Sequence, residues 1–289
     1  MKKFLALLLA LMMSLSLVAC GGNDAAEEEA PAEDTAVEDT AVEETPESDA
    51  AYIEGNGKVV VGITIYEPMN YYDEAGNLTG FDTEFALAVC DKLGLEAEFQ
   101  EINWDTKEIE LAGKTIDCIW NGMTITADRA ANMSISLPYV KNAQVIVVKA
   151  DSAYASTADL VDATLVAEMG SAGEAQIEGE DANADLAQAE YVGMNKQTDC
   201  LMEVKAGTAD AAVLDWTLAK SMVGEGTDFA DLKMIEGVEL ATEEYGIAFR
   251  QGSDFTAKVD DAIKALVADG TLPALAEKYG LALAPAIAG

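Results

Sequence analysis

The sequence predicts an α/β protein in which strands and helices alternate around a sheet. Three observations indicate this. Short β-branched or apolar runs alternate with segments whose apolar residues recur at helical spacing. Glycines such as Gly94 and Gly270 stand where a helix is expected to end. The alternation also occurs twice, in two stretches of about 100 residues, a common size for one α/β lobe.

The first stretch opens with a strand and an amphipathic helix. Residues 58–65 are β-branched, and Phe81, Phe85 and Val89 then follow one another at intervals of four, with Asp82 taken as the N-cap. The remaining elements follow from the same patterns. In order, we expect a strand at 58–65, a helix at 82–93, a strand at 97–102, a short helix near 107–112, a strand at 115–120, helical turns at 126–133 and a strand at 144–149.

The second stretch repeats this alternation and closes with a strong helix. Phe255, Val259 and Ile263 form an apolar stripe at helical spacing ahead of Gly270. Two lobes with a cleft between them place a binding site at the strand ends that face the cleft. We expect helices at 157–161, 172–178, 196–206, 216–223 and 254–268, and strands at 164–168, 190–192, 209–214 and 245–250.

The N-terminus predicts export and a lipid anchor. Lys2 and Lys3 precede 16 uncharged residues, 4–19, a run shorter than the roughly 20 residues of a spanning helix. It ends in Leu-Val-Ala before Cys20, which resembles the lipobox of bacterial lipoproteins. This resemblance implies that 1–19 is a signal peptide and that Cys20 takes the lipid and anchors the protein outside the cytoplasm. The alternative is an ordinary signal with an incidental cysteine.

An acidic segment follows the expected lipid site. Between Gly21 and Gly55 there are thirteen Asp or Glu residues and no Lys or Arg, so we expect 20–55 to be a disordered tether. An acidic interaction tail is the alternative. The folded part then carries 15 basic and 40 acidic residues, a net charge of −25. Such a surface is unsuited to nucleic acid or to anionic membranes.

Cysteine and histidine usage limits the chemistry. Cys90, Cys118 and Cys200 lie far apart in apolar contexts, which favours buried free thiols, with a Cys90–Cys118 disulfide as the alternative. Histidine is absent, which removes Ser-His-Asp and Cys-His catalysis and the commonest metal ligand. We therefore expect no catalytic residue, no metal and no cofactor.

Five short motifs are informative when they are considered together. In order, they are Gly-Phe-Asp at 80–82, Gly-Met-Thr-Ile-Thr-Ala-Asp-Arg at 122–129, Ala-Asp-Ala at 209–211, Tyr-Gly-Ile-Ala at 245–248 and Ala-Asp-Gly-Thr at 268–271. Their order and spacing resemble the bacterial extracellular solute-binding proteins of family 3, which serve ABC importers of polar amino acids. The resemblance implies the type II periplasmic-binding-protein fold, with two α/β lobes joined by two crossover strands around a central cleft.

The same resemblance divides the folded region. It places lobe 1 at 57–140 and 244–289 and lobe 2 at 141–243, with crossings near 139–143 and 241–245. It implies a monomer that binds a free amino acid and meets an ABC permease with its ATPase subunits. A lipid anchor suits a Gram-positive cell, because an untethered receptor there would diffuse away.

Arg129, Thr124 and Gly122 are the candidates on lobe 1. Arg129 offers a planar fork that matches a carboxylate, and the chain has only two arginines among its 17 basic residues. The resemblance implies that Thr124 shares the carboxylate and that Gly122 offers its carbonyl to the ammonium. A solvent-exposed helix arginine is the alternative for Arg129.

On lobe 2, Ser171, Ala172 and Asp215 are the candidates. Ser171 and Ala172 begin a helix, where backbone N–H groups favour an anion, although Ser171 also suits a simple N-cap. Asp215 matches the family aspartate that pairs with the ammonium, or serves as a turn or cap residue. Many relatives carry another aspartate in the first strand, where this chain has Ile63.

Four more residues complete the expected pocket. The family pattern places Tyr66 and Trp104 on either side of the ligand side chain, and Asn121 and Glu168 where they often face it. A buried carboxylate needs a cationic or hydrogen-bonding partner, so an inward Glu168 favours a polar or basic ligand. A Glu168 that points to solvent is the alternative.

The sequence thus predicts a binding protein that delivers a free amino acid to an ABC importer. Two alternatives remain. One is a ligand-sensing subunit of a membrane receptor, and the other is a dehydratase on the same scaffold, with acid–base chemistry at Glu168 and Asp215.

Overall fold

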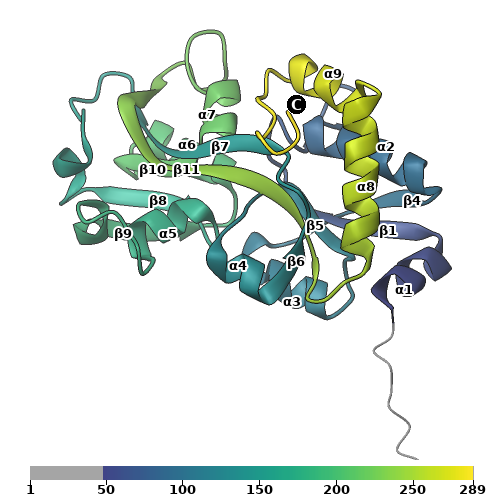
Figure 1. Ribbon diagram of the computed structural model, residues 1–289. Coiled ribbons are helices and arrows are strands. Elements are labelled where there is room, and N and C mark those ends of the chain that lie inside the picture. The colour runs from purple at the N-terminus through teal and green to yellow at the C-terminus, as the bar shows by residue number, and fades with distance from the viewer. Residues whose placement is uncertain (1–47, 289) are drawn as a thin grey trace, which may run out of the picture. The chain divides into compact units, whose positions relative to one another are not determined.

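A mixed β-sheet runs through the protein. The computed structural model describes residues 48–288, and within that range nine strands form one sheet of order β4-β1-β5-β11-β7-β10-β8-β9, with β6 pairing to β11 (Figure 1). The predicted α/β class is confirmed. The strands are β1 (Lys58–Ile63), β4 (Glu96–Glu101), β5 (Cys118–Thr124), β6 (Met133–Ile135), β7 (Val140–Lys149), β8 (Thr164–Glu168), β9 (Glu190–Met194), β10 (Ala211–Asp215) and β11 (Leu232–Arg250), besides the small hairpin β2 (Tyr71–Tyr72) and β3 (Leu78–Thr79).

Helices cover this sheet, and most lie where the sequence predicts them. The exceptions are α1, α9 and the short turns η1 and η3, which the sequence did not predict. The α-helices are α1 (Asp49–Asn56), α2 (Phe81–Leu93), α3 (Lys107–Ala112), α4 (Ala127–Asn132), α5 (Ala172–Glu178), α6 (Gln197–Ala206), α7 (Trp216–Met222), α8 (Phe255–Ala268) and α9 (Thr271–Lys278), and the 3-10 turns are η1 (Trp104–Thr106), η2 (Thr157–Leu160) and η3 (Leu186–Gln188).

Two strands connect the two ends of the sheet. β7 and β11 pair antiparallel along the segments expected to cross, with Val140 opposite Tyr245 and Gln144 opposite Ala241. We call the elements before β7, together with α8 and α9, the terminal group. The elements between β7 and β11, from η2 to α7, are the central group. β11 leaves the central group beside β7 and ends in the terminal group beside β5 and β6 (Figure 1).

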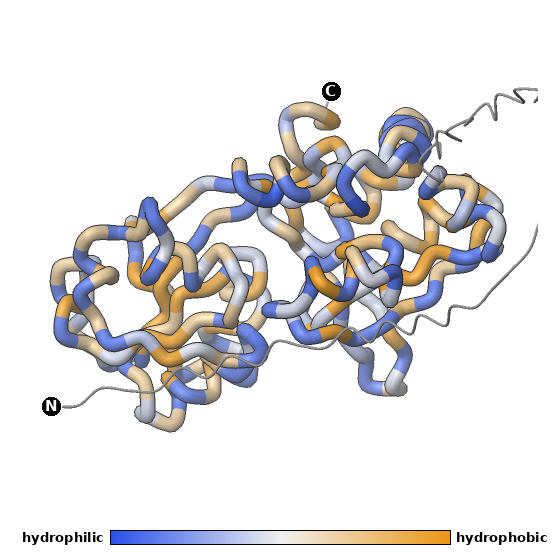
Figure 2. Tube along the Cα trace, turned by 90° about the horizontal axis from the view of Figure 1, so that it is seen from below, coloured by the Kyte–Doolittle hydropathy of each residue, from blue (hydrophilic) through white to orange (hydrophobic). Residues whose placement is uncertain are grey.

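Alternating side chains bury both faces of the sheet. In β5, Cys118 and Trp120 pack in the core under α2 and α8, whereas Ile119 and Met123 pack in a separate core with Trp104. This follows from the two-residue period of a strand. Hydrophobic and hydrophilic stretches alternate along the trace (Figure 2). Burial on both faces explains why central strands such as β8 and β10 are nearly continuous apolar runs.

Helix α1 corrects the expected limit of the tether. Residues 48–55 were expected to be disordered, but α1 is a helix with Ser48 as its N-cap. Its Asp49 pairs with Arg250 at 2.6 Å, and its Ile53 is fully buried. A buried apolar side chain and a paired carboxylate offset the acidic composition that argued against order. The rest of the expected tether, the signal peptide and Cys20 lie outside the described residues.

Asp82 corrects a second expectation. The N-cap of α2 is Gly80, and it makes no side-chain cap. The Asp82 carboxylate instead accepts hydrogen bonds from the Gly122 N–H at 2.7 Å and the Tyr139 hydroxyl at 2.9 Å. Burial raises its pKa to about 7. Asp82 therefore supports the strand that carries the predicted site residue Gly122.

The structure also shows the state of the three described cysteines and whether any described helix could span a membrane. Cys90, Cys118 and Cys200 are buried free thiols, as predicted. Across residues 48–288, no helix is both long and apolar enough to cross a bilayer.

Candidate functional site

One pocket gathers all ten residues that the sequence singled out, together with Gln197, which it missed. The lining residues are Tyr66, Trp104, Asn121, Gly122, Thr124, Arg129, Glu168, Ser171, Ala172, Gln197 and Asp215. They come from both groups of elements. Many of them stand at strand ends. Asn121, Gly122 and Thr124 lie in the second half of β5, and Glu168 and Asp215 are the last residues of β8 and β10. β8 and β10 are parallel, so their carboxyl ends meet at one edge of the sheet.

Arg129 is buried between the two groups. Thr126 caps its helix by accepting a hydrogen bond from the Arg129 N–H at 3.1 Å. One guanidinium nitrogen donates to the Thr124 carbonyl at 2.8 Å, and the other terminal nitrogen donates to the Gly170 carbonyl at 2.9 Å. Burial lowers the pKa of the guanidinium from its ordinary value, although arginine stays charged in proteins. The structure thus excludes the solvent-exposed alternative.

Lys107 stands beside Arg129 and was not predicted. Its ammonium donates to the same Gly170 carbonyl at 2.9 Å and to the Trp104 carbonyl at 3.1 Å. The side chain is only 4% exposed, and burial and the nearby Arg129 lower its pKa to about 8. Its position in α3 carries no motif, so only the fold reveals that it reaches the central group.

Asp215 is paired with a second carboxylate, Glu243, which the sequence analysis also missed. The Asn142 amide donates to Asp215 at 2.5 Å and to Glu243 at 2.6 Å. The Gln144 amide likewise donates to Asp215 at 2.8 Å and to Glu243 at 2.9 Å. Two NH2 groups therefore bridge the two carboxylates.

Further donors surround this pair. The Gln197 amide donates to the other Asp215 oxygen, and the Thr124 hydroxyl donates to Glu243 at 2.8 Å. Asp215 occupies the N-cap position of α7 but makes no side-chain cap there, so a capping role does not explain it. Burial raises the pKa of both carboxyls, that of Glu243 to about 7 with a contribution from Asp215.

Glu168 is buried inside the pocket, which excludes the solvent-facing alternative. It is 3% exposed, and among residues 48–288 its Oε1 atom has no hydrogen-bond partner. Burial and then Asp215 raise its pKa to about 8, while Lys107 acts in the opposite direction. An unpartnered carboxylate oxygen in a pocket is costly unless a ligand donates to it.

Two aromatic residues and a glycine shape the pocket. The Tyr66 hydroxyl bonds to Thr217 in the central group and to the Tyr245 hydroxyl at 2.6 Å. Gly122 has a φ of 56°, and a Cβ there would lie 2.6 Å from the Tyr66 ring, so only glycine fits. Trp104 is 5% exposed and lies under the Lys107 ammonium, 5.0 Å from its ring centre.

Some of the hydrogen-bonding groups at the start of helix α5, residues 171–172, already have partners within the protein. Ser171 is the N-cap of α5 and accepts a hydrogen bond from the Glu174 N–H at 3.1 Å, which confirms the capping interpretation. The Ser171 N–H donates to the Glu168 carbonyl at 3.1 Å. Of the two predicted anion donors, Ala172 therefore offers the more suitable N–H.

Asn121 has a structural set of partners. Its amide nitrogen donates to the Thr64 carbonyl at 2.8 Å and to Asn70 at 2.7 Å, while its oxygen accepts from the Thr64 hydroxyl at 2.7 Å. Trp120 beside it packs edge-on against Phe85 at 5.0 Å, in the core. Asn121 thus fixes the pocket wall.

Comparison with known proteins places the chain in a family. A model of the bacterial extracellular solute-binding proteins, family 3, matches residues 59–282. The chain belongs to this family.

Individual relatives match between about three quarters and nearly all of the chain. It is 28% identical to the arginine-binding extracellular protein ArtP of Bacillus subtilis, over 96% of this chain and 98% of ArtP. It is 29% identical to the L-cystine-binding protein TcyJ of Escherichia coli, over 78% and 84% of the two chains. A crystal structure of a mutant of ArgBP from T. maritima superposes with a TM-score of 0.73 at 33% identity, covering 80% of this chain and 99% of that one.

Proposed function

We propose that this protein captures a free cationic amino acid, arginine foremost, outside the cytoplasm and delivers it to an ABC importer. The observation that carries the proposal is the charge around the pocket. Two buried carboxylates, Glu168 and Asp215, and the half-buried Glu243 lie near two buried cations, Lys107 and Arg129. A ligand with two positive charges and one negative charge balances this set. The names of the arginine-binding relatives support the same ligand.

Each end of the ligand has a partner of suitable chemistry. A guanidinium has five N–H donors, so the two bonds that Arg129 makes leave donors for the ligand carboxylate, which Thr124 and Ala172 then share. Asp215 accepts from the α-ammonium, as does the Gly122 carbonyl. The ligand side chain lies between Tyr66 and Trp104, where a cation interacts favourably with aromatic faces, and reaches the unpartnered oxygen of Glu168.

Delivery follows from a change of conformation. The lobes proposed at 57–140 with 244–289 and at 141–243 both contribute to the pocket, so a ligand that touches both favours the closed state by its differential affinity. The importer then binds the closed monomer and accepts the ligand. A protein that only binds and releases has no need of the acid–base chemistry of a dehydratase, and the relatives named above are binding proteins.

Membrane attachment is the remaining part of the proposal. We propose that lipid on Cys20 retains the protein at the cell surface, with the acidic segment before α1 as its tether. Cys20→Ala is expected to release the protein into the medium of a Gram-positive host, whereas the wild type fractionates with membranes and incorporates labelled palmitate.

Calorimetry on the domain without its signal peptide tests the ligand. Arginine, lysine, histidine, glutamine and cystine are titrated separately, and arginine is expected to bind most tightly. Arg129→Ala and Asp215→Ala are expected to abolish binding without unfolding the domain. Tight binding of only uncharged amino acids would refute the cationic ligand, and measurable turnover of a bound compound would refute a purely binding role.

A further inference from the structure

Glu243 connects the ammonium-binding end of the pocket with solvent. It lies on β11, does not line the ligand pocket, and faces an outer groove instead. That groove is lined by Ile125, Lys141, Thr242, Glu243, Glu244 and Pro285. Asp215 stands on the other side, inside the pocket. Glu243 therefore forms a bridge between Asp215 and the outside of the protein.

The hydrogen bonds of the pair show that the two carboxylates lie close together. Asn142 and Gln144 each place one NH2 group between the two carboxylates, so an oxygen of Asp215 and an oxygen of Glu243 share the same donors. Two carboxylates held this closely, with Asp215 buried and Glu243 half-buried, cannot both ionise easily, and one shared proton relieves the repulsion. The positive charge of a bound ammonium relieves the same repulsion.

We propose that Asp215 and Glu243 share one proton before the ligand binds, and that capture of the ligand ammonium expels this proton through Glu243 into the outer groove. The inference rests on the proposed function, because it assigns the ammonium to Asp215. The ammonium keeps its own protons, and the expelled proton passes to water or buffer in the groove. Glu243 thus acts through Asp215 and is a positioning residue.

Other ionisable groups lie near the pair, and the experiment has to distinguish their titration from that of Asp215 and Glu243. The buried Glu168 carboxyl also has a raised pKa, and the Tyr66 and Tyr245 hydroxyls stay neutral because burial raises their pKa values. Arg129 supplies a positive charge nearby. The charged or ionisable groups whose contributions have to be distinguished from the pair are Lys107, Arg129, Glu168, Tyr66 and Tyr245 around the pocket, and Lys141 and Glu244 in the outer groove.

The first test counts protons by calorimetry. Arginine binding is measured at pH 6 in two buffers that differ in ionisation enthalpy, since the difference in heat reports the protons released. The wild type is expected to release about one proton more than Glu243→Gln. Glu244→Gln, a change one residue further along the same strand, should match the wild type. Glu168→Gln removes the competing carboxyl and should retain the release from the pair.

Affinity gives an independent measure. The pKa of Glu243 is about 7. At pH 5.5, about 1.5 pH units below this pKa, the pair holds its proton, and the ligand can bind only after that proton is lost. Its contribution should weaken ligand binding about 30-fold between pH 8 and pH 5.5, and Glu243→Gln should remove that factor. Equal proton release and equal pH dependence in Glu243→Gln and the wild type would overturn the proposal.

A second test needs no ligand. Carbon-13 NMR of glutamate side-chain carboxyls is expected to show one resonance that titrates near pH 7 and disappears in Glu243→Gln. In Asp215→Asn the same resonance should titrate at lower pH, because its charged partner is gone. If this titration is present but no amino acid binds, the proposed function fails while the shared proton stands. If every glutamate titrates in its ordinary range except Glu168, the shared proton is refuted.

Discussion

At the scale of single residues, Glu168 is a case where binding and stability oppose each other. Its carboxyl is buried with one oxygen unpartnered among the described residues, and its pKa is raised from 4.5 to about 8. The folded protein therefore holds the proton more tightly than the unfolded chain. Stability from this group is fully present below pH 4.5 and is lost as the pH rises through 8. A cationic ligand side chain reverses this penalty by pairing with the ionised form.

Glu168→Gln should accordingly stabilise the fold and weaken ligand binding. We expect a higher free energy of unfolding at pH 8 in the absence of ligand, by about 1 kcal/mol or more, because no buried charge has to form. Arginine affinity should fall at least about tenfold, and glutamine affinity should change less. Urea denaturation and calorimetry measure the two effects. The matched control is Glu190→Gln at an exposed position of β9, and an unaltered arginine affinity in Glu168→Gln would contradict the assigned role.

Of the ten pocket residues, Gly122, Thr124 and Arg129 lie within one of the five motifs, and the other seven could be predicted from their positions relative to the family pattern that the motifs define. Lys107, Gln197 and Glu243 could not. Lys107 and Glu243 sit in stretches rich in charged residues, where an exposed side chain is the normal expectation. Their burial depends on contacts across the sheet, such as the Asn142 amide that reaches Glu243. Local composition carries no sign of such a contact.

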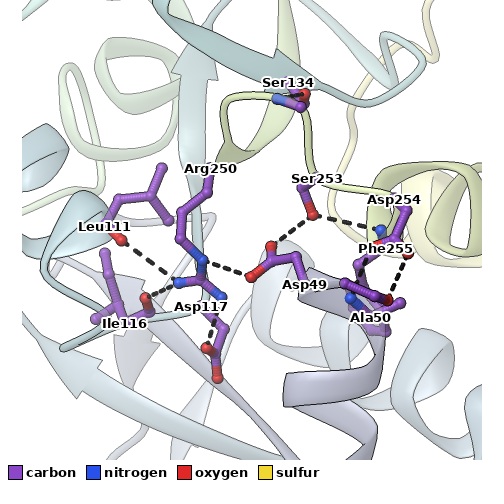
Figure 3. A network of polar contacts seen from close by, with 12 residues as sticks. Asp49, Ala50, Leu111, Ile116, Asp117, Ser134, Arg250, Ser253, Asp254 and Phe255 are labelled. Atoms are coloured by element: carbon purple, nitrogen blue, oxygen red, sulfur yellow. Dashed lines mark hydrogen bonds and ion pairs between the residues drawn. The ribbon is translucent and has the colours of Figure 1, made fainter. Parts of the chain in front are cut away.

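At the scale of elements, helix α1 docks through a buried ion-pair network (Figure 3). Arg250 donates to Asp49 at 2.6 Å, to Asp117 at 3.0 Å and to the Ile116 carbonyl at 2.8 Å. Ser253 donates to the other Asp49 oxygen at 2.6 Å. The side chains of Asp49 and Arg250 are 11% and 12% exposed, so little solvent screens this pair.

Asp49→Ala tests whether this network fixes the start of the folded domain. We expect a loss of about 1–3 kcal/mol in the free energy of unfolding, because Arg250 and Ser253 lose a buried acceptor. Glu54→Gln is the control in the same helix. Its pair with Lys258 is about half exposed, so its effect should stay within about 0.5 kcal/mol. Equal effects of the two changes in urea denaturation would contradict the special role of Asp49.

The elements that the sequence mispredicted share one physical cause. The strand expected at 245–250 in fact begins at Leu232, and its first half mixes apolar residues with acidic ones and is partly exposed. That half is a strand because β7 pairs with it over 232–234 and again from Glu239 onward, on both sides of an irregular stretch. Helix α1 likewise depends on Arg250, some 200 residues further along the chain. Helix α2, with its apolar stripe and its Gly94 stop, needed no such partner and was predicted closely.

At the scale of the whole molecule, several direct contacts hold the terminal and central groups together. The Gly170 carbonyl accepts hydrogen bonds from both Lys107 and Arg129. On the opposite side of the pocket the Thr217 hydroxyl bonds to Tyr66, and Ser221 donates to Glu67 at 2.9 Å. If the protein alternates between open and closed states, these bonds favour the closed state, and part of the affinity depends on residues that never touch the ligand.

Thr217→Val is the cleanest test of that dependence. Valine keeps the shape of threonine but removes the hydroxyl, while Tyr66 and Tyr245 still bond to each other at 2.6 Å. Thr217 does not line the pocket and carries no charge, so the change leaves the ligand contacts and the charge balance intact. The Thr217 hydroxyl bonds to Tyr66 and also to the Tyr245 hydroxyl at 2.9 Å, and the loss of both bonds, about 1 kcal/mol net, should weaken arginine binding about three- to tenfold. Small-angle scattering without ligand should show a larger radius of gyration than in the wild type.

The control is Thr242→Val, at an exposed position on β11, which should alter neither the arginine affinity nor the radius of gyration. Weakened binding without any change in the scattering curve would mean that Thr217 acts on the pocket through Tyr66 alone, and not on the balance between open and closed forms.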